Sequence, residues 1–298
     1  MIIPAWQRAA SIRAAIDSVL RQTWTEFELI VVDDGSSDGT AEIAEAVEDP
    51  RVRVVRHAAN AGAGAARNTG VRAAKGDWVA FQDSDDEWLP DKLSRQIARR
   101  DAGLADGRAP IAVYCAMAVV RRPPAGGRMT LDCIPWPDAR RLEGDVADAL
   151  LDGNFVSTQT LFARRDALIE AGLFDETLPA LEDWDLALRL SRLGPFAFID
   201  EPLVIQRFSD NSLTRSGAKR LAGYARILEK NAETLAADPV RLARHARRIA
   251  LGHARLGDRG AALRWTRRSL AARPLPSGWA PLIRALVAGA APRPGKTP

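Results

Sequence analysis

Four carboxylates stand within five consecutive residues of this chain. They follow a short apolar run, Trp78–Phe81, that predicts a buried strand, and Pro90 behind them suits the first turn of a helix. Carboxylates this close raise one another's pKa unless a cation lies among them. The spacing therefore predicts a Mg²⁺ or Mn²⁺ ion held by one or two of these side chains and by ligand phosphates. A solvated acidic loop that caps a helix is the alternative. The four residues are Asp83, Asp85, Asp86 and Glu87.

Two further acids end an earlier apolar run. Asp33 and Asp34 follow Glu28–Val32, whose continuous apolar residues are typical of a strand buried on both faces. A plain turn would also explain the pair, because Asp-Gly-Ser is favourable turn chemistry. The acid pair of a receiver domain is another alternative. Such a domain is much shorter than this chain and needs a later phosphoacceptor Asp and a Lys, which the acidic stretch after Phe81 fits poorly.

The elements that must position these acids alternate between strands and helices through residue 95. This alternation predicts an α/β fold with right-handed β-α-β units and a mostly parallel sheet. Ligands bind beyond the carboxyl ends of the strands in such sheets, so the loops that follow the strands should meet at one crevice. Those loops are Pro4–Trp6, Asp33-Asp34, His57–Arg67 and Asp83–Asp86. The expected strands are Met1–Pro4, Glu28–Val32, Val52–Arg56 and Trp78–Phe81, and the expected helices are Ala9–Gln22, Thr40–Val47 and Ala65–Ala74.

Residues 104–140 are less regular, and the segments after them return to clear apolar patterns. Strands are expected at Ile111–Val120 and Phe155–Phe162, and a turn at Pro123–Arg128. Helices are expected at Leu142–Leu151, Arg164–Ala171 and Glu182–Leu190. Leu186 and Leu190 share one face of the last helix, so it should pack on the sheet with its acidic first turn at the crevice.

The charge of the chain is distributed unevenly. Residues 217–298 carry 17 Lys and Arg against 4 Asp and Glu, whereas residues 1–216 carry 25 against 34. We therefore expect one domain over residues 1–216, a basic α-helical region over 217–291 and a disordered tail over 292–298. An Arg-rich solvated helix face explains the basic region, and contact with an anionic membrane surface or a phosphorylated acceptor is the sharper alternative. Its expected helices are Leu221–Leu235, Pro239–Leu256 and Gly260–Ala272, with a further apolar stretch at Trp279–Ala291.

Cysteine usage and hydropathy bear on location. Cys115 and Cys133 are the only cysteines, and their spacing suits neither a disulfide framework nor a zinc site. No apolar run reaches the roughly 18 residues of a membrane span. We expect a cytoplasmic protein, with possible peripheral contact to the inner face of the membrane, and no nucleic acid partner.

Several separate segments together resemble the signatures of glycosyltransferase family two, in order and with the family's spacing, over residues 1 to about 215. The resemblance implies a GT-A fold, with a mostly parallel sheet flanked by helices and an α-helical C-terminal region. It also implies an inverting enzyme that uses a nucleotide-sugar donor. The segments are Ile2–Arg8, Ser18–Thr23, Phe27–Thr40, Asn60–Gly62, Ala66–Gly70, Ala74–Asp77 and Asp83–Asp86.

The resemblance implies donor-binding roles for residues after the first strands. Pro4, Ala5 and Trp6 match the nucleotide-binding turn, with Trp6 stacking on the base. Asp34 matches the acid that accepts a hydrogen bond from a uracil-type N–H. Arg67 matches an arginine that faces the crevice, where diphosphate binding and a salt bridge to the acidic loop are both open. Asp83-Ser84-Asp85 matches the DXD motif, so Asp83 and Asp85 would contact the metal, and Asp83 and Ser84 the donor.

The resemblance also implies acceptor-side roles. Glu182-Asp183 matches the motif that supplies the catalytic base, and we assign the base to Asp183. The Trp184 ring would either form the floor of the acceptor pocket or pack in the core. Many relatives have a His shortly after Arg207, and here Ser209 stands in its place, so Arg207 would neutralise more charge. The Gln-x-x-Arg-Trp signature of processive polymerases is absent, which favours transfer of single sugars.

These inferences predict a metal-dependent, inverting glycosyltransferase. It would move a sugar from a nucleotide diphosphate, most readily a UDP-sugar, to a hydroxyl of a carbohydrate or lipid-linked acceptor. A non-catalytic nucleotide-sugar binder whose basic tail recruits partners is the main alternative. A nucleotidyltransferase is the other, but the glycine-rich loop with a basic residue that is usual at its first strand is absent.

Overall fold

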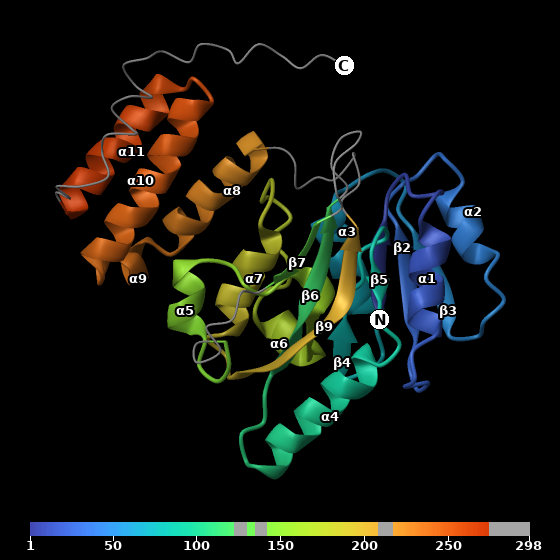
Figure 1. The fold of residues 1–298 in the computed structure, drawn as a ribbon. Coiled ribbons are helices and arrows are strands. Elements are labelled where there is room, and N and C mark those ends of the chain that lie inside the picture. Colours follow the sequence, from blue (N-terminus) through green and yellow to red (C-terminus); the bar gives the residue numbers. More distant parts are fainter. Residues whose placement is uncertain (122–129, 135–141, 208–216, 274–298) are drawn as a thin grey trace. The chain divides into compact units, whose positions relative to one another are not determined.

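The computed structural model describes residues 1–121, 130–134, 142–207 and 217–273 (Figure 1). The chain divides into two compact units, Met1–Thr177 with Glu182–Ser212 and Leu178–Leu181 with Leu213–Pro298. The predicted boundary at residue 216, the turn at Pro123–Arg128, the apolar stretch at Trp279–Ala291 and the predicted tail 292–298 lie outside the described residues.

The first unit opens with a parallel three-stranded sheet in the order β1-β2-β3. The Ile and Val residues of its first two strands are buried on both faces, as the continuous apolar runs predict, whereas Val52, Val54 and Val55 of the third are partly buried. Ile3 pairs with Val31, and Val31 with Val54. The strands are β1 (Ile2–Ala5), β2 (Leu29–Asp33) and β3 (Val52–Arg56), and the helices that follow them are α1 (Ile12–Leu20), α2 (Thr40–Glu45) and α3 (Ala63–Ala73).

A bridge joins this sheet to a second one. Ile2 pairs in parallel with Phe81, and Gln82 N donates to the Ile2 carbonyl at 2.9 Å, so the chain after β4 lies beside β1. The chain thus moves from β1 to β3 in one direction and then returns past β1. Right-handed crossovers consequently place α3 on the opposite face from α1 and α2.

The second sheet has mixed pairing in the order β4-β8-β6-β9-β5, with β7 paired to β6. Only β6 and β9 are parallel within it. One cluster of buried apolar residues, including Ile3, Val31, Val113 and Ile199, runs through both sheets and makes them one platform. The strands are β4 (Trp78–Ala80), β5 (Glu87–Trp88), β6 (Ala112–Arg121), β7 (Thr130–Ile134), β8 (Leu161–Arg164) and β9 (Phe196–Arg207), and the remaining helices are α4 (Lys92–Ala105), α5 (Ala147–Asp152), α6 (Arg165–Glu170) and α7 (Glu182–Leu190).

The predicted α/β fold with a helical C-terminal region is confirmed, but two predicted elements of the first unit are wrong in extent. The segment Phe155–Phe162 is not one strand, because Thr158–Thr160 forms a 3₁₀ turn and β8 begins only at Leu161. The helix expected from Leu142 begins at Ala147, because Gly144 has a φ of +81° and pairs with Phe196.

Strands β5, β7 and β9 are absent from the sequence prediction. In β9 the polar run Asp200-Glu201-Pro202 looks like a break in the sequence. The structure accommodates it as a bulge, since Cys115 pairs with Ile199 while the next residue, Ala116, pairs with Pro202. A bulge of this kind depends on the neighbouring strand, which is distant in sequence.

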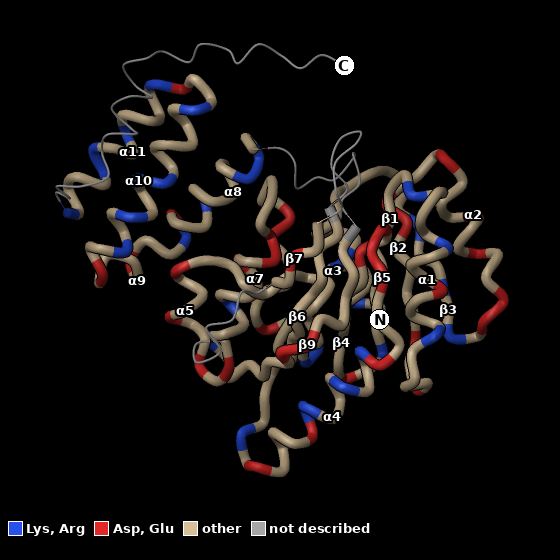
Figure 2. The backbone as a smooth tube through the Cα atoms, in the orientation of Figure 1, with Lys and Arg blue, Asp and Glu red and all other residues tan. Residues whose placement is uncertain are grey.

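The second unit is helical and rich in small residues. Asp238 and Asp258 cap α10 and α11 by accepting from Arg241 N at 3.0 Å and Ala261 N at 2.9 Å. Buried Ala250, Ala254 and Ala262 allow these two helices to approach closely. The predicted helix Leu221–Leu235 is in fact two helices that meet at Asn231. The helices are α8 (Gly217–Lys230), α9 (Ala232–Ala236), α10 (Pro239–Arg255) and α11 (Arg259–Ala272), and Figure 2 shows the Lys and Arg residues along them.

None of the helices that the structure describes has both the length and the apolar character that crossing a membrane requires.

Candidate active site

The loop after β1 presents an exposed aromatic ring. Pro4 and Ala5 are buried in the strand, whereas the Trp6 side chain is 47% exposed. The neighbouring Gln7 has a φ of +52°, and the turn after β2 holds this conformation. Gln7 N donates to Ser36 Oγ at 3.0 Å and Arg8 N donates to Thr40 Oγ1 at 2.8 Å. The loop therefore offers a flat apolar face from a fixed backbone.

Asp34 lies beside this loop and organises the chain after β3. Its backbone N–H donates to the Ala5 carbonyl at 2.8 Å, and its side chain is 2% exposed. The carboxylate accepts from Ala61 N at 2.9 Å and Gly62 N at 2.7 Å, which holds the start of α3. His57 Nδ1 lies 2.7 Å from the same carboxylate. The predicted loops after β1, β2 and β3 thus meet, as parallel strands require.

Arg67 on α3 connects two acidic segments that are far apart in sequence. The buried guanidinium donates through Nη2 to Asp83 Oδ1 at 2.8 Å and through Nη1 to Glu182 Oε1 at 2.9 Å. Burial alone would lower the pKa of Arg67, but the charges of Asp83 and Glu182 outweigh burial and hold the pKa above its ordinary value. Arg67 therefore stays charged and fixes both acidic segments at one place.

The pair Asp83 and Asp85 is the candidate metal site. Both side chains are about a quarter exposed, and Asp85 Oδ2 lies 3.5 Å from Arg8 Nη2. Ser84 between them is buried. Among the described residues, no group of three His, Cys, Asp or Glu side chains could hold a metal ion. Two carboxylates fit an ion of the Mg²⁺ type, which takes its remaining ligands from phosphates and water.

The first turn of α7 contains Asp183, the predicted catalytic base. Asp183 is partly buried, and its Oδ1 accepts from Trp184 N at 2.8 Å. Burial and, after it, the negative charge of Glu182 raise the pKa of Asp183 to about 7, while the Trp184 N–H and the Arg67 charge act in the opposite direction. Asp183 thus has the environment of a proton acceptor near neutral pH.

Trp184 and Arg207 were also predicted on the acceptor side. Trp184 is 2% exposed and its Nε1 donates to the Leu150 carbonyl at 2.7 Å, so this ring packs in the core as in the second of the two alternatives. Arg207 ends β9 and pairs with Val120, and its side chain is outside the described residues, as is Ser209.

Residues 1–170 match the family described as glycosyl transferase family 2, which is more than half of the chain. The chain belongs to glycosyltransferase family 2. The sequence resemblance to this family is therefore confirmed.

Two relatives of this family 2 protein take part in polysaccharide synthesis by name. The succinoglycan biosynthesis protein ExoO of Rhizobium meliloti is 34% identical over 197 residues, which cover 62% of this chain and 53% of that protein. The chain thus matches only about half the length of that relative. The amylovoran biosynthesis glycosyltransferase AmsB of Erwinia amylovora is 29% identical over 210 residues, which cover 68% of this chain and 67% of AmsB.

Solved structures agree in fold. Residues 1–349 of S. aureus TarS, crystallised with UDP-GlcNAc, give a TM-score of 0.59 at 18% identity and cover 89% of this chain and 88% of theirs. The mannosyltransferase PcManGT of Pyrobaculum calidifontis, solved with GDP-Man and Mn²⁺, gives a TM-score of 0.54 at 21% identity. The match covers 97% of this chain and 78% of PcManGT. At these identities the likeness establishes the GT-A fold of this family 2 protein.

Sequence reasoning assigned no role to Asn68 of this family 2 protein. The buried amide donates to the Phe174 carbonyl at 2.9 Å and accepts from Phe174 N at 2.9 Å. It also donates to Glu176 Oε1 at 2.7 Å. Asn68 thereby ties the segment that leads toward α7 to α3. A polar residue inside an otherwise apolar helical face was the available signal.

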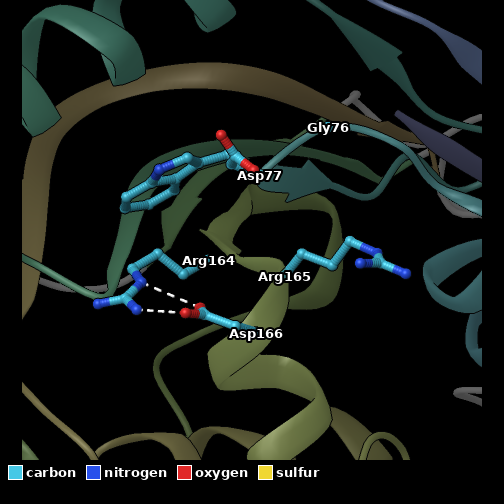
Figure 3. Close-up of a pocket in the computed structure, with 6 residues that line it drawn as sticks. Gly76, Asp77, Arg164, Arg165 and Asp166 are labelled. Atoms are coloured by element: carbon cyan, nitrogen blue, oxygen red, sulfur yellow. Dashed lines mark hydrogen bonds and ion pairs between the residues drawn. The ribbon is translucent and has the colours of Figure 1, made fainter.

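A separate cavity of about 290 Å³ lies at the amino end of β4 (Figure 3). The acids of the family 2 site follow the carboxyl end of that strand. In the cavity, Arg164 Nε donates a hydrogen bond to Asp166 Oδ1 at 3.0 Å, and Arg165 Nε donates one to the Val71 carbonyl at 2.9 Å. Arg164, Arg165 and Asp166 are thus engaged with protein groups. The lining residues are Gly76, Asp77, Trp78, Arg164, Arg165 and Asp166.

Proposed function

We propose that this protein transfers a single sugar from a UDP-sugar to a hydroxyl of a saccharide or lipid-linked acceptor, with inversion at the transferred carbon. The names of two relatives, for succinoglycan and amylovoran synthesis, support a role in making surface polysaccharide or glycoconjugate. The lack of the processive signature supports one transfer for each binding event.

The observation that carries this proposal is the double ion pair of Arg67. Asp83 follows β4 and Glu182 begins α7, and one buried guanidinium holds both, at 2.8 and 2.9 Å. Donor-side and acceptor-side acids therefore lie on the two sides of a single cation. Asp183 is the residue next to Glu182, which supports a position for the proposed base near the proposed donor site. An enzyme that joins two substrates needs this proximity.

The donor would lie across the carboxyl ends of β1, β2 and β4. The exposed ring of Trp6 offers a stacking face for the base, and Asp34 offers an acceptor for a base N–H. Arg67 Nε is buried and has no acceptor among the described residues, which leaves a donor for a phosphate oxygen. Asp83 and Asp85 would hold a divalent ion, and such an ion neutralises the charge that develops on the departing diphosphate.

Asp183 would act as the base. Its carboxylate takes the proton of the acceptor hydroxyl while the hydroxyl oxygen bonds to the anomeric carbon of the sugar. The bond from that carbon to the diphosphate oxygen breaks on the opposite face, and the nucleoside diphosphate leaves with the electron pair. A pKa near 7 suits this role, because such a group is both available as a base and strong enough to accept the proton.

The test compares two neighbouring acids. Asp183→Asn should lower kcat by 10²-fold or more, since general bases contribute about 10²–10⁴-fold, while the Kd for UDP changes little. Glu182→Gln removes an ion-pair partner of Arg67, so it should change both kcat and the Kd for UDP moderately. Transfer at a near-normal rate by Asp183→Asn would refute the assignment, and loss confined to Glu182→Gln would move the base to that residue. Sugar transfer and UDP binding by calorimetry are the two measurements.

The basic helices would bring this enzyme to an anionic membrane surface, where lipid-linked acceptors are found. Neither α10 nor α11 contains an Asp or Glu. On α11, Leu263 and Leu270 are 46% and 44% exposed, and exposed Arg264 and Arg267 share their face. Exposed Leu flanked by Arg is the combination that binds the headgroup region of acidic bilayers.

A further inference from the structure

His57 links the candidate base-recognising acid to helix α3. The residue follows β3 directly, and its side chain is 18% exposed. One ring nitrogen, Nδ1, lies 2.7 Å from Asp34 Oδ1, and the other, Nε2, lies 2.9 Å from Thr69 Oγ1. A His with both nitrogens engaged cannot rotate without losing two hydrogen bonds, so its ring is fixed.

The lone pairs of Asp34 are almost all in use. Oδ1 accepts from His57 Nδ1 and from Ala61 N at 2.9 Å, which fills both of its lone pairs. Oδ2 accepts from Gly62 N at 2.7 Å and keeps one position. Of the two oxygens, Oδ2 is therefore the one that keeps a lone pair for a ligand N–H. His57 and the two backbone groups decide which oxygen of Asp34 is available and where it points.

The contact with Asp34 decides one proton position on His57. An ionised Asp34 only accepts hydrogen bonds, so Nδ1 must carry a proton. In the neutral ring Nε2 is then an acceptor, and the Thr69 hydroxyl donates to it. Thr69 thus holds the ring in the orientation in which Nδ1 faces Asp34. The three side chains come from the ends of β2 and β3 and from α3.

We propose that His57 is a positioning residue that sets base selectivity through Asp34, with Thr69 holding its ring. This inference rests on the proposed function, in which Asp34 accepts from the nucleotide base. A fixed carboxylate oxygen favours a base with a ring N–H at the recognised edge, as uracil has. It disfavours cytosine, whose corresponding ring nitrogen is an acceptor and would face a second acceptor. Loss of the His57 ring frees the Asp34 carboxylate to rotate, so the discrimination between uracil and cytosine weakens.

The experiment measures the Kd of UDP and of CDP, together with kcat and KM, in paired variants. His57→Leu should weaken UDP binding about tenfold, bring the UDP and CDP affinities closer together and leave kcat within about threefold. His57→Asn retains an amide N–H near the Nδ1 position and should restore most of the selectivity. Thr69→Val should shift selectivity in the same direction as His57→Leu but less, and Thr69→Ser should not. His253→Leu, in the second unit, is the matched control.

The outcomes separate this inference from the proposed function. If Asp34→Asn loses UDP affinity while His57→Leu and Thr69→Val keep the ratio of UDP to CDP affinity, His57 has no positioning role. If Asp34→Asn keeps UDP affinity, the proposed base recognition by Asp34 is itself wrong. Should His57→Leu fail to fold, Thr69→Val decides the question, because it leaves His57 in place. A purely structural role would lower the Tm of both variants without changing the ratio.

Discussion

Asp183 differs from the other acids of the site in what surrounds its carboxyl group. Asp83 and Glu182 share the Arg67 guanidinium, and Asp34 accepts three hydrogen bonds. Asp183 accepts from the Trp184 N–H at Oδ1 and from the Asn154 side chain, and it has the negative charge of Glu182 beside it. Burial and the charge of Glu182 therefore favour the protonated form of Asp183.

The pH dependence of transfer should follow this carboxyl group. Because the pKa of Asp183 is raised to about 7, the ionised base is present above that pH and is lost as the pH falls through it. We expect log(kcat/KM) to rise with pH at a slope near one below about 7 and to level off above it. The check is a pH–rate profile at saturating metal ion. A flat profile from pH 5 to 8 would contradict the expectation, and Glu182→Gln should move the rise to lower pH because it removes a negative neighbour.

At the scale of elements, α3 organises the site through four consecutive residues. Arg67 binds the two acidic segments, Asn68 holds the Phe174 segment, and Thr69 contacts His57. Gly70 follows, and an added Cβ there would lie 2.5 Å from Ile2 Cγ2 of β1. The helix must lie this close to β1 for its polar side chains to reach their partners. Glycine at this position is thus a packing requirement of the site.

Substitution of Gly70 should separate the helix from the strand. Gly70→Ala should lower the free energy of unfolding by about 1–3 kcal/mol, as overpacking of a core does, and should reduce transfer because Arg67 moves with α3. Gly64→Ala in the same helix is the matched control. Its added Cβ would meet Phe174 Cβ at an ordinary 3.7 Å, so stability should stay constant or rise slightly. Denaturant titration of both variants is the measurement, and equal losses would show that the contact with Ile2 is unimportant.

At the scale of the whole molecule, the two compact units carry different kinds of charge. The first contains the acidic segments of the site, whereas α10 and α11 of the second have nine Arg and no Asp or Glu between Pro239 and Ala272 apart from Asp258 in the turn. This separation of charge supports the proposal that the first unit would bind a metal ion and that the helices would meet an anionic surface (Figure 2).

Vesicle binding should therefore depend on lipid charge and on one helix face. The protein should sediment with phosphatidylcholine vesicles that contain phosphatidylglycerol and not with phosphatidylcholine alone, and salt should weaken binding. Arg264→Glu with Arg267→Glu should lower the partition coefficient at least about tenfold, and Leu263→Ser with Leu270→Ser should also lower it. Arg21→Glu with Arg72→Glu, at exposed positions of the first unit, is the matched control. If the Leu pair has no effect while heparin competes fully, the face binds anionic polymers rather than a bilayer.

Much of the first sheet could be predicted because its information is local. Val52–Arg56 is a strand with the predicted limits, and β1 and β2, like β4 of the second sheet, differ from prediction by a residue or so, since each is a short run that contains β-branched residues and is followed by polar turn residues. The residues at the carboxyl ends of these strands were identified for the same reason. Strand β9 was not predicted, because its polar interruption is tolerated only through the bulge opposite β6.

The amino-acid sequence by itself determined the α/β class, the family and the candidate acids, because residue type, apolar period and motif spacing are properties of neighbouring positions. Only the tertiary structure decided that Arg67 joins Asp83 to Glu182, that Trp184 is buried and that His57 holds Asp34. It also decided the raised pKa of Asp183. These features depend on the exclusion of water and on contacts between residues far apart along the chain, and both arise only when the chain has folded.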